Sequence, residues 1–253
     1  MKRLLLLLCL FNKLSAQTSP NPSFELYILA GQSNMAGRGP LTDSLKAMGS
    51  DSLFSFSKEQ QWVPAHHPLH FDKPAIVGAG PGLAFGIEMC KAKPHLRIGL
   101  IPCAVGGTPI EHWLPGAYDS ATNTHPWDDA LARIKAAMQY GVIKGIIWHQ
   151  GEANSNPAAA AKYIEQLSEF ITRVRKLVGN PRLPFVAGEL GYFFTSANNI
   201  NTVLQTLPST VPFTAVASAA NLTDKGDHLH FDAASANELG KRYAAKMLVL
   251  QKR

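Results

Sequence analysis

Aspartate and histidine residues cluster near the C-terminus, in the segment Asp224-Lys225-Gly226-Asp227-His228-Leu229-His230. Residues three apart can face each other in a turn, so the Asp227 carboxylate can accept the N–H on one nitrogen of His230. The other nitrogen is then free to act as a general base. His228 competes for this role, but adjacent positions bend away from each other. The spacing therefore favours His230 as the base and Asp227 as its partner.

A serine that such a base could activate lies in the segment Gly31-Gln32-Ser33-Asn34-Met35. Serine is a weak nucleophile until a base accepts its proton. Ser33 falls at the predicted start of a helical turn, where its own unsatisfied N–H can point toward a developing oxyanion. An ordinary helix N-cap has the same pattern. The segment also differs from the Gly-x-Ser-x-Gly elbow, because Met35 replaces the second glycine.

Two other segments carry backbone and side-chain donors. The glycine pair in Gly106-Gly107-Thr108 lets the backbone approach a ligand, although a plain turn has the same sequence. The segment from His149 to Asn154, His-Gln-Gly-Glu-Ala-Asn, is dense in polar side chains. Gln150 can supply an amide donor to an oxyanion. Glu152 can orient a histidine or hydrogen-bond a substrate.

A cluster of histidines offers an alternative chemistry. His66, His67, His70 and Asp72 include a histidine pair four apart and a carboxylate, which are possible metal ligands. The glutamate of a zincin helix is missing, and Pro68 opposes a helix at this position. We therefore expect no metal and a pocket wall instead, with His70 and Trp113 as candidate substrate contacts. Trp113 could stack on a sugar face or belong to the core.

The elements that position these residues alternate regularly along the chain. Five apolar segments are predicted as strands and five amphipathic segments as helices, which indicates a three-layer α/β/α domain with a five-stranded parallel sheet. The candidate residues follow the first, second, third and fifth strands, at the edge of the sheet where ligands bind. The predicted strands are 24–30, 96–102, 142–148, 185–190 and 213–217, and the predicted helices are 82–93, 127–140, 158–178, 196–206 and 233–250. The segment 38–80 lacks clear periodicity and is predicted to be a long functional loop.

The first residues are predicted to be a secretory signal. Met1-Lys2-Arg3 precedes a short apolar run, which is about half of the roughly 20 residues that a membrane-spanning helix needs. We expect cleavage after Ala16, a catalytic domain over residues 17–253, a secreted or periplasmic protein and no stable membrane insertion. Lipidation of Cys9 is an alternative that its neighbour Leu8 disfavours.

Composition narrows the function classes further. The chain has 253 residues, and 46% of them are hydrophobic, which is enough for one domain with a full core. Its formal charge is +6. Removal of residues 1–16 takes away three cations and no acid, so the charge falls to +3. With no basic run interleaved with aromatics, nucleic-acid binding is not expected. Cys90 and Cys103 could form a disulfide or stay as two buried thiols, and we favour the thiols slightly.

Together these segments resemble the sialate O-acetylesterase and acetylxylan esterase-like branch of the SGNH hydrolases. The resemblance runs from about residue 24 to residue 250 and implies a flavodoxin-like fold, removal of acetyl groups from carbohydrates and no cofactor. It does not imply a protein partner. The matching pieces are Gly31-Gln32-Ser33-Asn34, Pro81-Gly82-Leu83-Ala84-Phe85, Gly106-Gly107-Thr108, His149-Gln150-Gly151-Glu152 and Asp227-x-x-His230.

The resemblance also implies a role for each site residue. Ser33 is the nucleophile, His230 the base and Asp227 its partner, while the oxyanion donors are the backbone N–H groups of Ser33 and Gly107 and the side chain of Gln150. Glu152 is a second candidate acid or a substrate contact. The predicted substrate pocket consists of Asn34, His70, Trp113, His149 and Asn154. Acetylated xylan, other plant polysaccharides and O-acetylated sialic acid are all candidate substrates. A catalytically silent glycan-binding module and a lipid or thioester hydrolase are the alternative functions.

Overall fold

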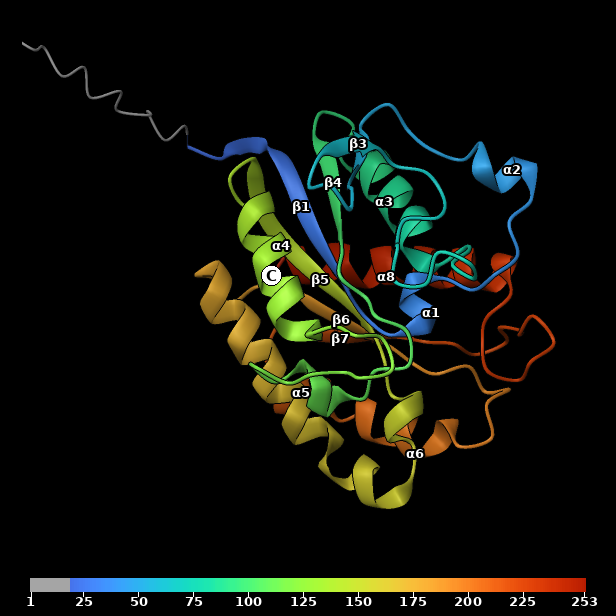
Figure 1. Ribbon diagram of the computed structural model, residues 1–253. Helices are drawn as coiled ribbons and strands as arrows, with labels where there is room; N and C mark the ends of the chain where they lie inside the picture. Colours follow the sequence, from blue (N-terminus) through green and yellow to red (C-terminus); the bar gives the residue numbers. More distant parts are fainter. Residues whose placement is uncertain (1–18) are drawn as a thin grey trace, which may run out of the picture.

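A single seven-stranded sheet with helices on both faces forms the protein (Figure 1). The computed structural model describes residues 19–253, so the predicted signal segment 1–16 lies outside the described residues and stays a prediction. The strand order is β3-β2-β4-β1-β5-β6-β7. The three-layer α/β architecture predicted from the alternation of strands and helices is therefore confirmed.

The five predicted strands lie next to one another in the sheet and are all parallel. They are β1 (Asn21–Gly31), β4 (Arg97–Pro102), β5 (Gly141–His149), β6 (Phe185–Gly188) and β7 (Thr214–Ala217). All four neighbouring pairs among them are parallel. Counted along the chain, their spatial order is 2-1-3-4-5, which is the flavodoxin-like order. Their apolar runs lack strict alternation because helices cover both faces of the sheet.

Two further strands come from the segment 38–80, where the sequence predicts a loop. β2 (Leu53–Phe56) runs parallel to β4, and β3 (Trp62–Pro64) runs antiparallel to β2 at the edge of the sheet. The sheet therefore has seven strands and not five. These strands have four and three residues, which is too short for a periodic pattern to stand out among the surrounding Ser, Pro and His residues.

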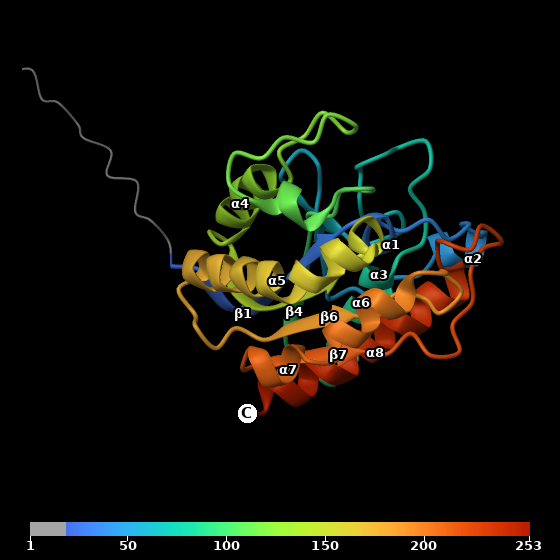
Figure 2. The ribbon, with the colours of Figure 1, turned by 90° about the horizontal axis from the view of Figure 1, so that it is seen from below.

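Four long helices cover the two faces of the sheet. α3 (Pro81–Ala92) and α8 (Ala233–Gln251) pack against each other on one face, while α4 (Pro126–Ala137) and α5 (Pro157–Val178) cover the other face (Figure 2). Local signals fix the helix ends. The Asn156 side chain caps α5 by accepting the N–H of Ala159, and Gly179 ends it in a left-handed conformation. The shorter helices are α1 (Ser33–Ala36), α2 (Asp43–Lys46), α6 (Ala197–Leu204) and α7 (Leu207–Thr210), with 3-10 turns at Ile110–Trp113 and Glu152–Asn154.

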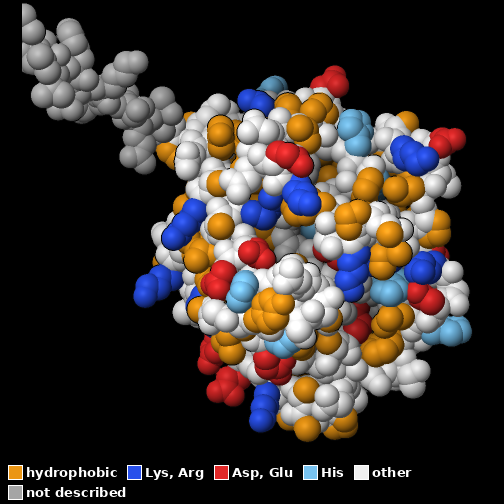
Figure 3. Space-filling model, in the orientation of Figure 1, with side chains coloured by type: hydrophobic (Ala, Val, Ile, Leu, Met, Phe, Trp, Pro, Cys, Tyr) orange, Lys and Arg blue, Asp and Glu red, His pale blue; other side chains and the backbone are white. Residues whose placement is uncertain are grey.

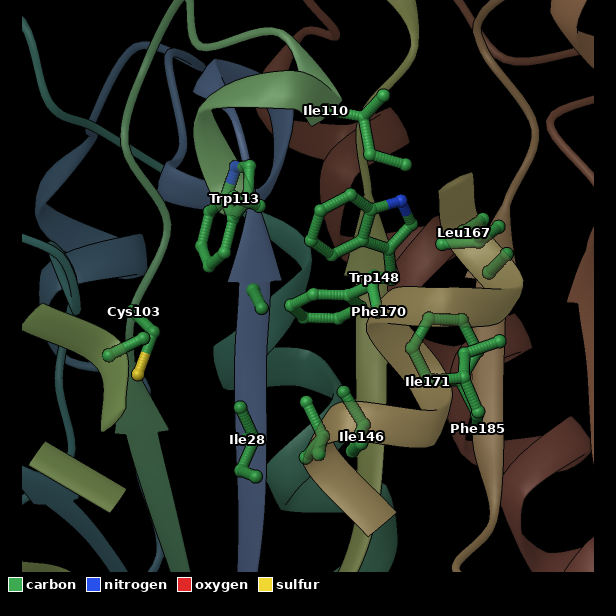
Figure 4. Close-up of a cluster of buried hydrophobic side chains, with 14 of the residues drawn as sticks. Ile28, Cys103, Ile110, Trp113, Ile146, Trp148, Leu167, Phe170, Ile171 and Phe185 are labelled. Atoms are coloured by element: carbon green, nitrogen blue, oxygen red, sulfur yellow. The ribbon is translucent and has the colours of Figure 1, made fainter. Parts of the chain in front are cut away.

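Each face of the sheet has its own hydrophobic core. The core under α4 and α5 is built around aromatic rings, and Trp113, Trp148 and Phe170 contact one another there edge-on or tilted (Figure 4). The core under α3 and α8 includes Tyr243 and Met247. Among the helices of residues 19–253, none has the length and apolarity that a membrane span requires. The two cores fix the sheet, so the loops at the carboxyl ends of its strands start from rigid positions.

Candidate active site

Ser33 is the first residue of α1, just beyond the carboxyl end of β1. Gly31 makes the turn before it possible, because its φ is +129° and a Cβ there would lie 2.1 Å from the carbonyl oxygen of His149. The Gln32 N–H donates to that same oxygen at 2.8 Å, which ties the turn to the end of β5. Because Ser33 begins a helix, its backbone N–H has no intrahelical acceptor.

A chain of hydrogen bonds joins Ser33 to Asp227 through His230. The Ser33 Oγ lies 3.0 Å from His230 Nε2, and His230 Nδ1 lies 2.7 Å from Asp227 Oδ2. The other carboxylate oxygen, Oδ1, accepts the backbone N–H groups of Leu229 and His230. The structure thus brings together, from opposite ends of the chain, the three residues predicted as nucleophile, base and acid.

The partners of Asp227 determine where His230 carries its proton. A carboxylate only accepts hydrogen bonds, so His230 Nδ1 holds the proton and the lone pair on Nε2 faces the Ser33 hydroxyl. Burial acts to raise the pKa of Asp227, but hydrogen bonds from His230 and from Lys225 hold that pKa well below its usual value. The carboxylate therefore stays ionised and can stabilise the imidazolium that forms when His230 accepts a proton.

Asn34 holds the loop that carries His230 against the nucleophile helix. Its Nδ2 donates to the carbonyl of Leu229 at 3.0 Å, and its Oδ1 accepts the N–H of Phe231 at 3.1 Å. The same Nδ2 also donates to Glu152 Oε1 at 2.5 Å. Glu152 therefore contacts Asn34 and not His230, which corrects its predicted role as a competing acid for the base.

A buried polar network continues behind Glu152. The Tyr243 hydroxyl donates to the Trp148 carbonyl at 2.8 Å, so it accepts the Nδ1–H of His149 at 3.0 Å. His149 Nε2 then faces Glu152 Oε1 at 3.9 Å. Burial lowers the pKa of His149 to about 3 and raises the pKa of Glu152 to about 6, against the hydrogen bond from Asn34. His149 is therefore neutral at physiological pH, whereas Glu152 titrates near it.

The raised pKa of Glu152 predicts a pH dependence of stability. Between the ordinary value of 4.5 and about 6 the folded protein binds more protons than the unfolded chain, so stability should fall as pH rises through this window. The shift corresponds to about 2 kcal/mol. Glu152→Gln keeps an oxygen that accepts from Asn34, so the variant should lack this loss. Urea midpoints at pH 4.5 and 7.5 measure the difference. The exposed Glu165→Gln is the control, and equal losses in all three proteins would contradict the prediction.

The glycine turn after β4 lies beside the start of α1. The Val105 N–H donates to the Gly31 carbonyl at 3.0 Å, which joins the end of β4 to the end of β1. Gly107 has a φ of +89°, a conformation that glycine adopts without strain. In the described part of the chain, neither the Ser33 N–H nor the Gly107 N–H donates to a backbone acceptor. Both groups are thus available to an oxyanion.

The side-chain amide of Gln150 makes hydrogen bonds inside the protein. Its Nε2 donates to Asn154 Oδ1 at 2.7 Å and lies 3.3 Å from both Gln32 Oε1 and the Thr108 carbonyl. One N–H therefore bonds to Asn154, and the other is shared between two acceptors at 3.3 Å. The prediction that Gln150 donates to the oxyanion stays a prediction. In this structure its side chain joins the turns that follow β1, β4 and β5.

The five residues predicted to line a substrate pocket are all buried. Each is at most 4% exposed, so these residues lie beneath the surface of the site and support it. Trp113 is the clearest correction: it is 0% exposed, packs on Trp148, and donates its indole N–H to Thr108 Oγ1 (Figure 4). The buried residues are Asn34, His70, Trp113, His149 and Asn154.

A buried ion pair next to the site was missed from the sequence. Arg38 Nη2 lies 2.7 Å from Asp72 Oδ2, and both side chains are 4% exposed or less. The same Asp72 oxygen accepts the Gly106 N–H at 2.8 Å. Burial acts to raise the pKa of Asp72, but the bond from Arg38 keeps that pKa below its usual value. The pair thus links α1, the segment 38–80 and the glycine turn. Its sequence signal was an arginine between two glycines directly after α1.

The remaining histidines and cysteines show no shared ligand geometry. Within residues 19–253, no group of three His, Cys, Asp or Glu side chains is placed to hold a metal ion. His66, His67 and His70 line a cavity beside β2, and burial lowers the pKa of both His67 and His70 to about 4. Cys90 and Cys103 are free, buried thiols, as the slightly favoured alternative predicted.

The sequence is similar to carbohydrate esterases. Residues 23–249 match a protein family described as carbohydrate esterase, sialic acid-specific acetylesterase. A probable carbohydrate esterase of Arabidopsis thaliana is 28% identical over 250 residues, which covers 91% of this chain and 92% of the relative. The chain is thus similar to that relative over nearly the full length of both.

Several solved structures have a similar fold. An X-ray structure of an Arabidopsis thaliana protein has a TM-score of 0.79 at 27% identity and covers 90% of this chain and 99% of its own. NanS has a TM-score of 0.71 at 16% identity, with coverage of 93% and 99%. A carbohydrate acetylesterase of Xanthomonas citri has a TM-score of 0.64 at 20% identity, with coverage of 90% and 56%. The last two are similar in fold alone.

Proposed function

The chain belongs to the carbohydrate esterase family described as sialic acid-specific acetylesterase, and from this premise we propose that Ser33 is the nucleophile with which it removes O-acetyl groups from carbohydrates. Membership makes the protein a carboxylic ester hydrolase. The observation that carries the assignment of Ser33 is the 3.0 Å contact from its Oγ to His230 Nε2, continued by the 2.7 Å contact from Nδ1 to Asp227.

In the acylation step, His230 Nε2 accepts the hydroxyl proton of Ser33 as Oγ attacks the acetyl carbonyl carbon. Asp227 stabilises the imidazolium, and the tetrahedral oxyanion accepts hydrogen bonds from the N–H groups of Ser33 and Gly107. When the intermediate collapses, the bond to the sugar oxygen breaks and that oxygen takes the proton from Nε2. The sugar leaves with a free hydroxyl, and an acetyl group remains on Oγ.

In the deacylation step, water replaces the sugar hydroxyl. His230 Nε2 accepts a proton from the water as its oxygen attacks the acetyl carbon, and the same two backbone N–H groups stabilise the second oxyanion. Collapse of this intermediate returns the proton to Ser33 Oγ and releases acetate. The Asn34 side chain supports both steps, because its bonds to Leu229 and Phe231 keep the His230 loop on α1.

A comparison of acetate release tests the proposed function. Purified protein is incubated with O-acetylated sialic acid, with acetylated xylo-oligosaccharides and with an acetylated pectic fragment, and Ser33→Ala serves as the blank. We expect acetate from at least one of these sugars and none above background from the variant. Binding of these sugars without release would favour a glycan-binding module. Faster cleavage of long-chain acyl esters would favour a lipid hydrolase.

A further inference from the structure

A lysine without an ionic partner lies beside the glycine turn of the proposed oxyanion site. A Cβ built on Gly107 would lie 3.9 Å from Lys73 Nζ, and apart from Gly107 and its two chain neighbours no other atom of residues 19–253 would come within 4 Å of it. Lys225, the other lysine at the site, has its ammonium 3.1 Å from Asp227 and is already paired. Among residues 19–253, Lys73 takes part in none of the salt bridges that lysines form.

The chain on both sides of Lys73 is anchored. The preceding residue, Asp72, is buried and bonded to Arg38 and to the Gly106 N–H. The Lys73 carbonyl accepts the N–H groups of Ile76 and Val77, both at 3.0 Å. The backbone at Lys73 is therefore anchored next to the turn that carries Gly107.

The charges around Lys73 leave its ammonium without compensation. Arg38 is neutralised by Asp72, and Asp227 is engaged by His230 and Lys225. On the face shown in Figure 3, Lys and Arg side chains are interspersed with Asp and Glu. In the proposed mechanism the Gly107 N–H donates to the acetyl oxygen, and such a hydrogen bond is about 2.9 Å long. The Lys73 ammonium, which lies beside this turn, is therefore within about one sugar ring of the bound ester.

We infer that Lys73 is a specificity-determining residue that binds the carboxylate of the acidic sugar bearing the acetyl ester. This inference rests on the proposed function of the site. A lysine ammonium is a compact point charge that pairs with a carboxylate through charge-assisted hydrogen bonds. A neutral sugar such as xylose offers it no anionic partner. The substrate class is therefore an O-acetylated sugar acid, either a sialic acid or a uronic acid.

Kinetics of Lys73→Gln on charged and neutral substrates test the inference. With an O-acetylated sialic acid or an acetylated galacturonate oligosaccharide, we expect kcat/KM to fall by about 10- to 100-fold, mainly through KM. With acetylated xylo-oligosaccharides or p-nitrophenyl acetate, the change should stay within about twofold. Lys73→Arg should retain most of the activity on the acidic sugar. Comparing the two acidic sugars shows which of them supplies the carboxylate.

The control is Lys176→Gln, because this exposed lysine lies in the last turn of α5, at the opposite edge of the sheet. It removes the same charge and should leave every substrate unchanged. The wild-type preference for the acidic sugar should also weaken at 1 M salt, where the screening length is about 3 Å.

Two outcomes would overturn the inference. An equal loss on charged and neutral esters in Lys73→Gln would mean that the ammonium acts on the oxyanion or on the turn itself. Unchanged kinetics on both acidic sugars would mean that Lys73 contacts no substrate carboxylate. Failure of the proposed function is distinguishable from both, because the wild-type protein would then release no acetate from any sugar.

Discussion

Replacing Ser33 with alanine should lower kcat/KM for an acetylated sugar by about 10⁴-fold or more, because the variant lacks the hydroxyl that contacts His230 Nε2. The exchange removes one buried oxygen and leaves the backbone of α1 in place, so folding should be preserved. Acetate release measured against a matched wild-type preparation gives the ratio. Thermal unfolding of both proteins is the control. Wild-type activity in a folded Ser33→Ala protein would contradict the assignment of the nucleophile.

Asp227→Asn should cost about 10³- to 10⁴-fold in kcat. Asp227 Oδ1 accepts two backbone N–H groups, from Leu229 and His230, so the amide oxygen of the variant must take that position. The amide NH₂ then faces His230 Nδ1 and donates to it. His230 is left with its proton on Nε2, and a protonated Nε2 cannot accept the Ser33 hydroxyl proton.

Glu152→Gln provides the matched comparison for this second prediction. Because glutamine keeps an oxygen for Asn34, its kcat/KM should stay within about tenfold of the wild type. Steady-state kinetics of both variants on one acetylated substrate decide between the two carboxylates. A severe loss in Glu152→Gln together with a mild loss in Asp227→Asn would show that Glu152 is the acid on which His230 depends.

The parts of the site that follow from local sequence could be predicted. Ser33 falls directly after an apolar strand and begins a helical turn, and Asp227 stands three residues before His230. The order of strands and helices then places both segments at one edge of a parallel sheet. These are short-range patterns, and the topology that joins them follows from the general rules for α/β domains.

The parts that depend on side-chain packing could not be predicted. The sequence does not indicate that Trp113 faces the core or that Gln150 directs its amide at three internal acceptors, because both facts depend on neighbours distant in the chain. The hydrogen bond between Glu152 and Asn34 could not be predicted for the same reason, since the two residues are 118 positions apart. β2 could not be predicted because a strand of four residues is too short to show a periodic pattern.

Trapping of the acetyl-enzyme tests the role of Ser33 most directly. Wild-type protein is mixed with excess p-nitrophenyl acetate, quenched in acid within the first turnovers, digested and analysed by peptide mass spectrometry. The expected result is an acetyl group on Ser33 in the wild-type protein and none in Ser33→Ala. If the wild-type reaction is quenched only after the substrate is exhausted, the acetyl group should be gone. An acetyl group on another residue, together with continued acetate release by Ser33→Ala, would contradict it.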